Sequence, residues 1–272
     1  MKQLMNRVAV VTGAGSGIGR ATSLRLAERG CRLALADVDR AGLEQTQRSI
    51  AALGRPVSTH VVDVADRARM QAFVDEVVSE HGGVHILVNN AGVSVSALFA
   101  DQSLEDFEWV ININLWGVIN GCKLFLPHLL AAEEGHIVNI SSVFGLIGVP
   151  RQSAYCATKF AVRGFSESLR IELSETRVGV TSVHPGGIAT NIAAATRVVG
   201  DARDRQNHDR LVERFKTMMP PEQCAARIVR GIEQNRARVL ITRETHLLDW
   251  AKRLAPVGST ALVSWGFKRT QP

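Results

Sequence analysis

An apolar run leads directly into a glycine-rich loop in Val8-Ala9-Val10-Val11-Thr12-Gly13-Ala14-Gly15-Ser16-Gly17-Ile18-Gly19. The β-branched residues of 8–12 predict a buried strand. A helix is expected after the loop, because apolar or small side chains recur at Ala21, Leu24, Leu26 and Ala27. Glycines here allow a tight turn, close packing of helix on strand, and approach of backbone N–H groups to an anion at the helix N-terminus.

A carboxylate follows the next predicted strand. The run 32–36 ends in Asp37, 20 residues after Gly17, where an acid that bonds the adenosine ribose hydroxyls of a dinucleotide belongs. Strand, glycine loop, helix, strand and acid in this order predict a dinucleotide site. NAD is favoured over NADP, because a carboxylate accepts from both ribose hydroxyls and repels a 2′-phosphate. Arg40 could offset that repulsion by folding back, but Asp39 beside it weakens this alternative.

Helix and strand patterns then alternate along the chain. Helices are predicted over about 40–53 and 67–81, and further strands over 58–62, 84–88, 136–140, 178–183 and 238–242. A length of 272 residues, 46% of them apolar, fits one sizeable α/β domain or at most two small ones. The alternation predicts a single doubly wound Rossmann domain, with a seven-stranded parallel sheet and helices on both faces.

Polar clusters follow several of these strands, at the sheet edge where ligands bind in such folds. Asp63-Val64 follows the third strand and Asn89-Asn90-Ala91-Gly92 the fourth. Simple turn chemistry is the alternative explanation for the two asparagines.

A long helical pattern over 103–134 is too apolar for a helix with one exposed face, so the sheet and a partner chain are both expected to cover it. Asn112 and Asn114 lie within it. An asparagine inside a buried helix usually has a structural role, and a functional one would hold a water and relay a proton.

A candidate proton-transfer site follows the strand 136–140. That strand ends on Ser141-Ser142, and after a loop a helix is expected from Ser153. Tyr155 and Lys159 are spaced i,i+4 and share a face, and a nearby ammonium lowers the pKa of a tyrosine toward that of a general base. Such spacing is common by chance, but Tyr155 is the only tyrosine of the chain.

Taken together, these motifs resemble the classical short-chain dehydrogenase/reductase family over roughly residues 5–245. Ser142 precedes Tyr155 by 13 residues, as the family's serine does. The matching motifs are Thr12 to Gly19, Asp63-Val64, Asn89 to Gly92, Asn114-Leu115-Trp116-Gly117, Ser142, Tyr155-Cys156-Ala157-Thr158-Lys159 and Pro185-Gly186.

The resemblance implies an NAD(P)-dependent oxidoreductase. Tyr155 would exchange a proton with the substrate oxygen, Lys159 would bind the nicotinamide ribose, Ser142 would hold the substrate oxygen, and Asn114 would support a water relay. The cofactor would contact Gly13, Ser16, Gly17, Ile18, Gly19, Asp37, Asp63, Val64, Asn90, Ala91, Gly92, Tyr155, Lys159, Pro185, Gly186, Ile188 and Thr190.

The segment 187–221 is expected to close over the substrate as a lid. Its apolar first half joins other apolar residues near the predicted site, Val93, Val95, Phe144, Leu146 and Val149, which favours an apolar substrate. Arg151 is the exception and is expected on the surface.

The leading prediction is an alcohol dehydrogenase or ketoreductase acting on an apolar secondary alcohol or its ketone. Reduction of carbon–carbon double bonds or dehydration, as in related members of the family, is an alternative, but the set of Ser142, Tyr155 and Lys159 favours alcohol or carbonyl chemistry.

The alternative is a catalytically silent, dinucleotide-sensing regulatory protein. The intact set of Ser142, Tyr155 and Lys159 argues against it, because a sensor needs no acid/base group.

The Rossmann domain is expected over 1–245, followed by a helical extension over 246–272. The formal charge of +6 is uneven: residues 1–196 hold 17 Lys+Arg and 18 Asp+Glu, whereas 197–272 hold 15 and 8. No nucleic-acid motif accompanies this basic tail. Tryptophans between Lys/Arg pairs resemble a membrane-surface segment, but packing on a subunit is favoured.

Many family members end in a tail that helps to build a tetramer, and this chain continues differently. A homodimer through 103–132 and the Tyr155 helix is therefore favoured over a homotetramer.

Widely spaced cysteines predict a reducing, cytoplasmic compartment without a disulfide framework or metal site. The start of the chain lacks signal-peptide features, and no stretch is expected to reach the ~18 apolar residues of a membrane span.

Overall fold

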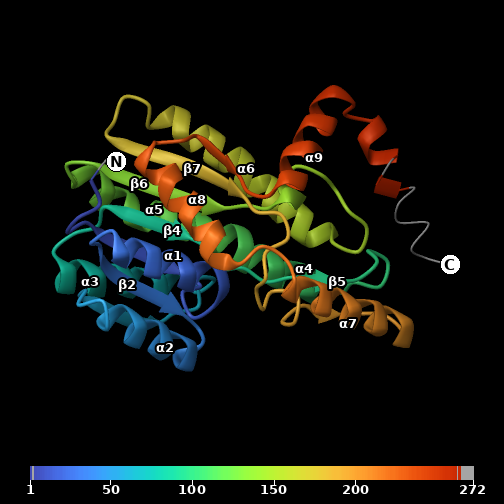
Figure 1. The fold of residues 1–272 in the computed structure, drawn as a ribbon, viewed down its shortest axis with the longest axis horizontal. Helices are drawn as coiled ribbons and strands as arrows, with labels where there is room; N and C mark the ends of the chain where they lie inside the picture. The colour runs from blue at the N-terminus through green and yellow to red at the C-terminus, as the bar shows by residue number, and fades with distance from the viewer. Residues whose placement is uncertain (2, 262, 265–272) are drawn as a thin grey trace.

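The computed structural model describes residues 1, 3–261 and 263–264. Its seven-stranded parallel sheet has the order β3-β2-β1-β4-β6-β7-β9, which confirms the predicted fold class (Figure 1). Chain order reverses between β1 and β4, so the connections after these two strands diverge and leave a crevice at the carboxyl edge. The strands are β1 Val8–Thr12, β2 Arg32–Asp37, β3 Val57–Val61, β4 Ile86–Asn89, β6 Gly135–Ile140, β7 Val178–His184 and β9 Arg238–Leu240.

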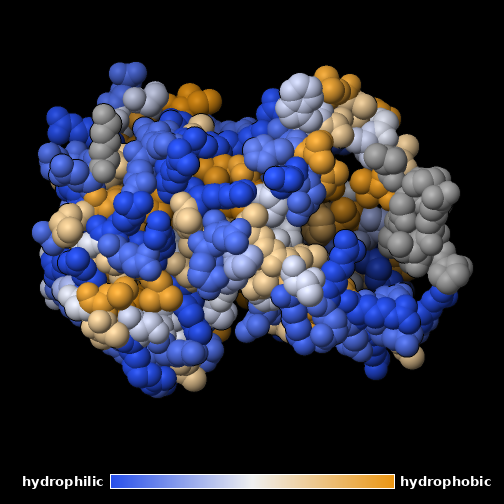
Figure 2. Space-filling view, viewed as in Figure 1, coloured by the Kyte–Doolittle hydropathy of each residue, from blue (hydrophilic) through white to orange (hydrophobic). Residues whose placement is uncertain are grey.

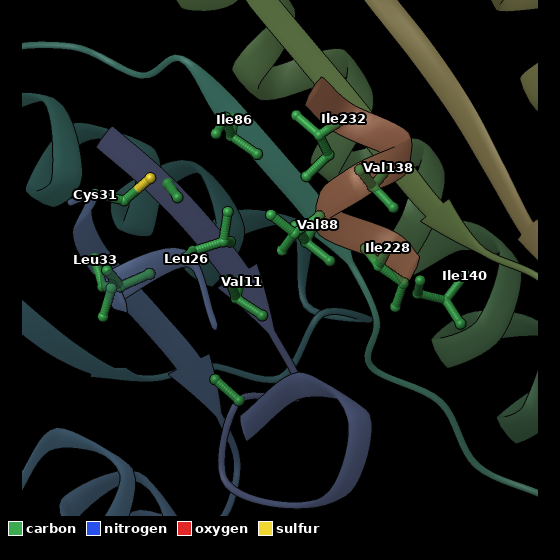
Figure 3. Close-up of a cluster of buried hydrophobic side chains, with 14 of the residues drawn as sticks. Val11, Leu26, Cys31, Leu33, Ile86, Val88, Val138, Ile140, Ile228 and Ile232 are labelled. Atoms are coloured by element: carbon green, nitrogen blue, oxygen red, sulfur yellow. The ribbon is translucent and has the colours of Figure 1, made fainter. Parts of the chain in front are cut away.

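Two apolar layers cover the sheet, because alternate residues of each strand point to opposite faces. Val11 packs with Leu26 of α1 and Ile228 of α8 on one face (Figure 3), whereas Val10 packs with Phe73 of α3 and Phe125 of α5 on the other. Burial on both faces explains why the strands read as continuous apolar runs. The covering helices are α1 Gly17–Glu28, α2 Arg40–Ala51 and α8 Pro221–Glu233 on the first face, and α3 Arg67–His81, α5 Gly117–Ala131 and α6 Ser153–Glu172 on the second.

The long helix expected over 103–134 is divided into three parts. α4, Leu104–Ile111, is joined to α5 by a π-helical turn, Asn112–Trp116. By length and composition, Leu104–Ala131 is a helix that could cross a membrane, contrary to the expectation from sequence. Val118, Cys122, Phe125 and Leu129 lie in the core against the sheet, so this helix belongs to the interior of the domain.

The lid segment is attached to the domain by a feature that the sequence did not predict. β5, Val95–Ser96, pairs in parallel with β8, Arg197–Val198, in a second small sheet. Strands of two residues carry no periodicity, which is why the pattern missed them. In α7, Ala202–Lys216, all of whose residues are described, no side chain is buried.

Arg151 was expected on the surface, and this was wrong. Its side chain is only 14% exposed and pairs with Asp204 of the lid at 2.9 Å, and it also donates to the Val199 carbonyl at 2.8 Å. The φ of Arg151 is 64°, a left-handed conformation that side chains seldom adopt. The charge of Arg151 suggested that its side chain is exposed to solvent. In the structure, the guanidinium joins the loop before α6 to the lid.

The C-terminal part of the described chain begins with α9, Arg243–Leu254. Asp249 on its inner side pairs with Arg238 of β9. The basic and aromatic stretch around Trp265 to Arg269, part of the expected extension, lies outside the described residues.

Candidate active site

The glycine-rich loop after β1 has the shape that a bound pyrophosphate requires. Gly13 and Gly17 have φ values of 64° and 50°, which favour glycine. A Cβ at Gly19 would overlap the Gly13 carbonyl oxygen, so the N-terminus of α1 closes on this loop only without a side chain there. Ser16 and Ile18 lie between these glycines. The loop and the helix N-terminus behind it fit an anionic dinucleotide.

Asp37 at the end of β2 is fixed beside this loop. Its Oδ2 accepts from the Gly15 N–H at 2.8 Å and its Oδ1 from the Asp39 N–H at 3.0 Å. Arg20 supports the loop from behind, because it donates to the Gly15 carbonyl and, through Nε, to Thr46 Oγ1 at 3.0 Å. Sequence reasoning missed Arg20 and Thr46, which belong to no motif.

Threonine and asparagine join the ends of β1 and β4. Thr12 Oγ1 accepts from the backbone N–H groups of Asn90 and Ala91 at 3.0 and 3.2 Å. In return Asn90 Nδ2 donates to the Thr12 and Gly13 carbonyls at 3.0 and 3.1 Å. The Asn90 amide thus holds the glycine loop itself. Neighbouring Asn89 points inward and donates to Asn139 Oδ1 at 2.9 Å.

Asn114 and Gly92 lie next to Lys159. Asn114 Oδ1 accepts from the Val93 N–H at 2.8 Å, and its Nδ2 donates to the Val93 carbonyl at 2.9 Å. A Cβ at Gly92 would lie 3.3 Å from Asn114 Oδ1 and 3.5 Å from Lys159 Nζ. The π-helical turn carries Asn114 into this buried position, and such turns are frequent at functional sites.

Ser142, Tyr155 and Lys159 come together at the junction of β6 and α6. The Ser142 side chain lies close enough to the Tyr155 phenol to lower its pKa, and Ser142 Oγ accepts from the Phe144 N–H at 3.1 Å. Lys159 Nζ lies 5.5 Å from the centroid of the Tyr155 ring and donates to the Ile140 carbonyl at 3.0 Å. The Ser141 hydroxyl donates to the Lys159 carbonyl at 2.7 Å, which ties α6 to the end of β6.

The pKa values differ in one respect from the sequence prediction. Burial raises the pKa of Tyr155 to about 12, although the neighbouring Ser142 side chain lowers it. Burial also lowers the pKa of Lys159 to about 8. The expected lowering of the tyrosine pKa was therefore wrong for this structure, because removal of the phenol from water dominates. At neutral pH the pair is a phenol beside an ammonium.

The loop after β7 crosses to the glycine loop. A Cβ at Gly17 would lie 3.0 Å from Thr190 Cγ2. Pro185 accepts from the Val143 N–H at 2.8 Å, and a Cβ at Gly186 would overlap Thr242 Oγ1. Buried Ile188 bridges to Met219, which brings the two ends of the lid segment together.

Asp63 and Val64 lie farther along the same edge, beyond the end of β3. Asp63 Oδ1 accepts from the Ala65 N–H at 2.9 Å, and the Val64 carbonyl accepts from Asn120 Nδ2 at 3.2 Å. The predicted residues therefore line one edge of the sheet, from β3 to β7.

Comparison with known proteins agrees with this arrangement. Residues 7–198 match the family described as short chain dehydrogenase. A Mycobacterium tuberculosis protein named "Putative oxidoreductase SadH" is 45% identical over 274 residues, covering 100% of this chain and 99% of that protein. The cyclohexanol dehydrogenase of an Acinetobacter species is 36% identical over 190 residues, 70% of this chain and 76% of that one.

A solved structure has the same fold along almost the whole chain. The short chain dehydrogenase/reductase of Burkholderia phymatum in complex with NAD superposes with a TM-score of 0.85 at 33% identity, covering 93% of each chain. The protein belongs to the short-chain dehydrogenase/reductase family. It is an oxidoreductase with an NAD-binding Rossmann fold.

Replacement of Gly19 by alanine is expected to weaken NADH binding at least tenfold, because the new methyl group would displace the Gly13 carbonyl and open the loop. Gly164→Ala is the matched control: its Cβ meets nothing within 4 Å, and alanine in a helix is favoured over glycine by about 1 kcal/mol. Fluorescence titration with NADH checks both variants. Equal affinity of the two would contradict the assignment of the loop.

Proposed function

We propose that the protein transfers a hydride between NAD(H) and an apolar secondary alcohol or its ketone. The observation that carries this proposal is the cluster at the carboxyl edge, where the Tyr155 phenol lies beside Ser142 and the buried Lys159 ammonium. The similarity to a cyclohexanol dehydrogenase and to a structure in complex with NAD supports both the reaction and the cofactor.

Bound NAD(H) would supply the hydride chemistry. In this proposal Gly13, Gly17 and Gly19 hold its pyrophosphate, and Asp37 accepts from the adenosine ribose. Lys159 binds the nicotinamide ribose through its ammonium. The remaining contacts follow along the edge, from Ser16, Ile18, Asp63, Val64, Asn90, Ala91 and Gly92 to Pro185, Gly186, Ile188 and Thr190.

Proton transfer is assigned to Tyr155. Its phenol is protonated at neutral pH, since its pKa is raised to about 12, which suits donation to a ketone oxygen during reduction. In the direction of alcohol oxidation, the same oxygen must first lose its proton in order to accept one from the alcohol, and burial of the phenol opposes that loss. Ser142 hydrogen-bonds the substrate oxygen and holds it in front of the tyrosine.

Asn114 supports a proton relay through water in this proposal. Both ends of its amide are committed to the backbone of Val93. Its contribution is therefore to fix the backbone of Gly92 and Val93 beside Lys159 Nζ, where a water that serves the relay would be held.

The substrate is proposed to be uncharged and apolar. The two arginines that join the lid to the domain are both paired: Arg151 with Asp204 at 2.9 Å, and Arg197 with Asp106 at 2.7 Å. The Arg197 guanidinium also lies 3.5 Å from the centre of the Trp109 ring. With these charges compensated, neither arginine is available as a counter-ion for a carboxylate or phosphate.

Tyr155→Phe is expected to lower kcat by about 10²–10⁴-fold, the usual effect of removing a general acid/base, while NADH affinity stays within a few-fold. Nicotinamide absorbance with a panel of secondary alcohols of graded bulk measures the reaction, and NADH titration serves as control. Tight cofactor binding without wild-type turnover on a broad panel would favour the regulatory, dinucleotide-sensing alternative.

The preference for NAD is proposed to rest on Asp37. Arg40 lines a different cavity, with Thr59, Val61 and Glu76 between α2, β3 and α3, and Asp37 is held by two backbone N–H groups. Asp37→Asn keeps an oxygen acceptor and removes the charge. We expect it to raise kcat/KM for NADP relative to NAD by about 10–100-fold, since hydrogen bonds to charged groups contribute about 1.5–3 kcal/mol. A wild type that prefers NADP would contradict the proposal.

A cytoplasmic homodimer is the proposed assembly. Exposed apolar side chains on α4, α5 and α6, namely Leu104, Leu130, Phe160 and Ile171, support an interface through these helices. All four cysteines lie among the described residues, buried and unpaired, in keeping with a reducing compartment.

The C-terminal tail is proposed to contact a subunit rather than a membrane. The outer side of α9 carries Leu247, Trp250 and Leu254, which are 71%, 67% and 75% exposed. In Figure 2 apolar residues appear over α9, whereas α7 is hydrophilic and the surface is hollowed between them. Leu247, Trp250 and Leu254 therefore form an exposed apolar stripe on α9 within the described part of the chain.

Sedimentation with anionic vesicles at low salt checks this assignment. We expect the protein to stay in the supernatant as a dimer, and we expect Trp250→Ser to weaken self-association. Co-sedimentation of the wild type, lost in Trp250→Ser, would instead indicate a membrane contact.

A further inference from the structure

The peptide bond after Ser142 is held on both sides by residues at the end of β7. Its N–H, which belongs to Val143, donates to the Pro185 carbonyl at 2.8 Å. Its carbonyl oxygen lies 3.1 Å from His184 Nδ1. The same oxygen also accepts from the Gly145 N–H at 2.9 Å. Every polar group of this peptide unit is therefore used.

The hydrogen bonds determine the tautomer of His184. A carbonyl oxygen can only accept, so Nδ1 must carry the proton. Ser182 Oγ lies 3.0 Å from Nε2. In a neutral imidazole Nε2 is then the acceptor, and the Ser182 hydroxyl donates to it. Ser182 and His184 are two residues apart on one strand and point to the same face, which permits this contact.

The imidazole is also kept neutral and fixed. Its side chain is fully buried, and burial lowers the pKa of His184 to about 4. A neutral, buried ring with both nitrogens hydrogen-bonded has one orientation, because rotation would leave a buried polar group without a partner.

We propose that His184 is a positioning residue of the reaction, which acts through Ser142 by fixing the peptide that follows it. This inference rests on the proposed function of Ser142 as the group that holds the substrate oxygen. Ser142 has an extended backbone, with φ −164° and ψ 167°, where the chain leaves β6 and enters the short helical turn Val143–Gly145. Rotation of the peptide at this point would carry the Ser142 hydroxyl away from Tyr155.

The hydrogen bonds of His184 and Pro185 to the peptide after Ser142 also connect the substrate-binding and the cofactor-binding parts of the site. Pro185 follows His184 directly and is one of the residues proposed to contact the cofactor. Because His184 and Pro185 hold one peptide of the substrate-binding turn, the substrate serine and the cofactor loop keep a fixed relation. Small displacements of reacting groups reduce rates strongly, which gives this fixed relation its catalytic value.

Two replacements separate positioning from packing. Asparagine at 184 carries an amide nitrogen on Cγ, as histidine carries Nδ1, and can donate to the Ser142 carbonyl. Leucine fills similar space without a donor. We expect His184→Leu to lower kcat at least tenfold with NADH affinity within twofold of wild type, and His184→Asn to recover most of the loss. If His184→Leu fails to fold, His184→Gln, whose donor lies one bond too far, replaces it.

A double-mutant cycle with Ser142→Ala tests the route of the effect. If His184 acts through Ser142, the double variant is no slower than Ser142→Ala alone. Additive losses in kcat, or equal activity of the leucine and asparagine variants, would overturn the inference. A wild type without turnover on the alcohol panel would overturn the proposed function, and this inference with it.

Discussion

An ammonium group kept away from water is the constraint on which the rest of the site depends. Lys159 is 3% exposed, and desolvation of a charge is expensive unless polar groups surround it. The Ile140 carbonyl accepts from its Nζ, and Gly92 leaves room for it beside Asn114. The loops after β4 and β6 must therefore both contact the Lys159 side chain. The same arrangement places Tyr155 next to Ser142.

The dinucleotide half of the edge is stabilised by a different kind of interaction. Its loops are joined chiefly by backbone groups and short polar side chains. Four hydrogen bonds, for example, join Thr12 and Gly13 after β1 to Asn90 and Ala91 after β4. Arg20 and Asp37 hold the glycine loop from the outer side. Such a loop is shaped before any ligand arrives, which reduces the entropy lost on binding.

The sequence predicted those parts of the molecule that repeat or that carry a fixed spacing. Continuous apolar runs predicted the seven strands, and period-3.6 patterns predicted most helices. The glycines and the serine–tyrosine–lysine set located the edge. The π-helical turn was missed, since Ile111, Leu115 and Val118 keep a spacing near the helical period through Asn112 to Trp116. Arg151 was misplaced because polarity does not reveal a partner such as Asp204, which is 53 residues away.

The pKa values of the site residues were the other property that the sequence did not predict. The spacing of Tyr155 and Lys159 indicates that they are neighbours, but not how much water remains around each. Burial opposes ionisation of both groups, and it moves their pKa values toward about 12 and about 8. His184 was missed for a related reason. Its position next to Pro185 in the sequence does not indicate that its ring contacts the Ser142 carbonyl.

Rigidity is distributed unevenly between the catalytic edge and the lid. The edge is tied to the sheet by buried hydrogen bonds, whereas the lid is held by a two-residue ladder, the bridge of Ile188 to Met219 and the ion pairs of Arg151 and Arg197. The pair of Arg197, whose side chain is 50% exposed, contributes little, and α7 adds no buried side chain. Movement of α7 alone would therefore expose little apolar surface compared with unfolding of the sheet. In the proposed function, a substrate would enter from this side while Ser142, Tyr155 and Lys159 stay in place.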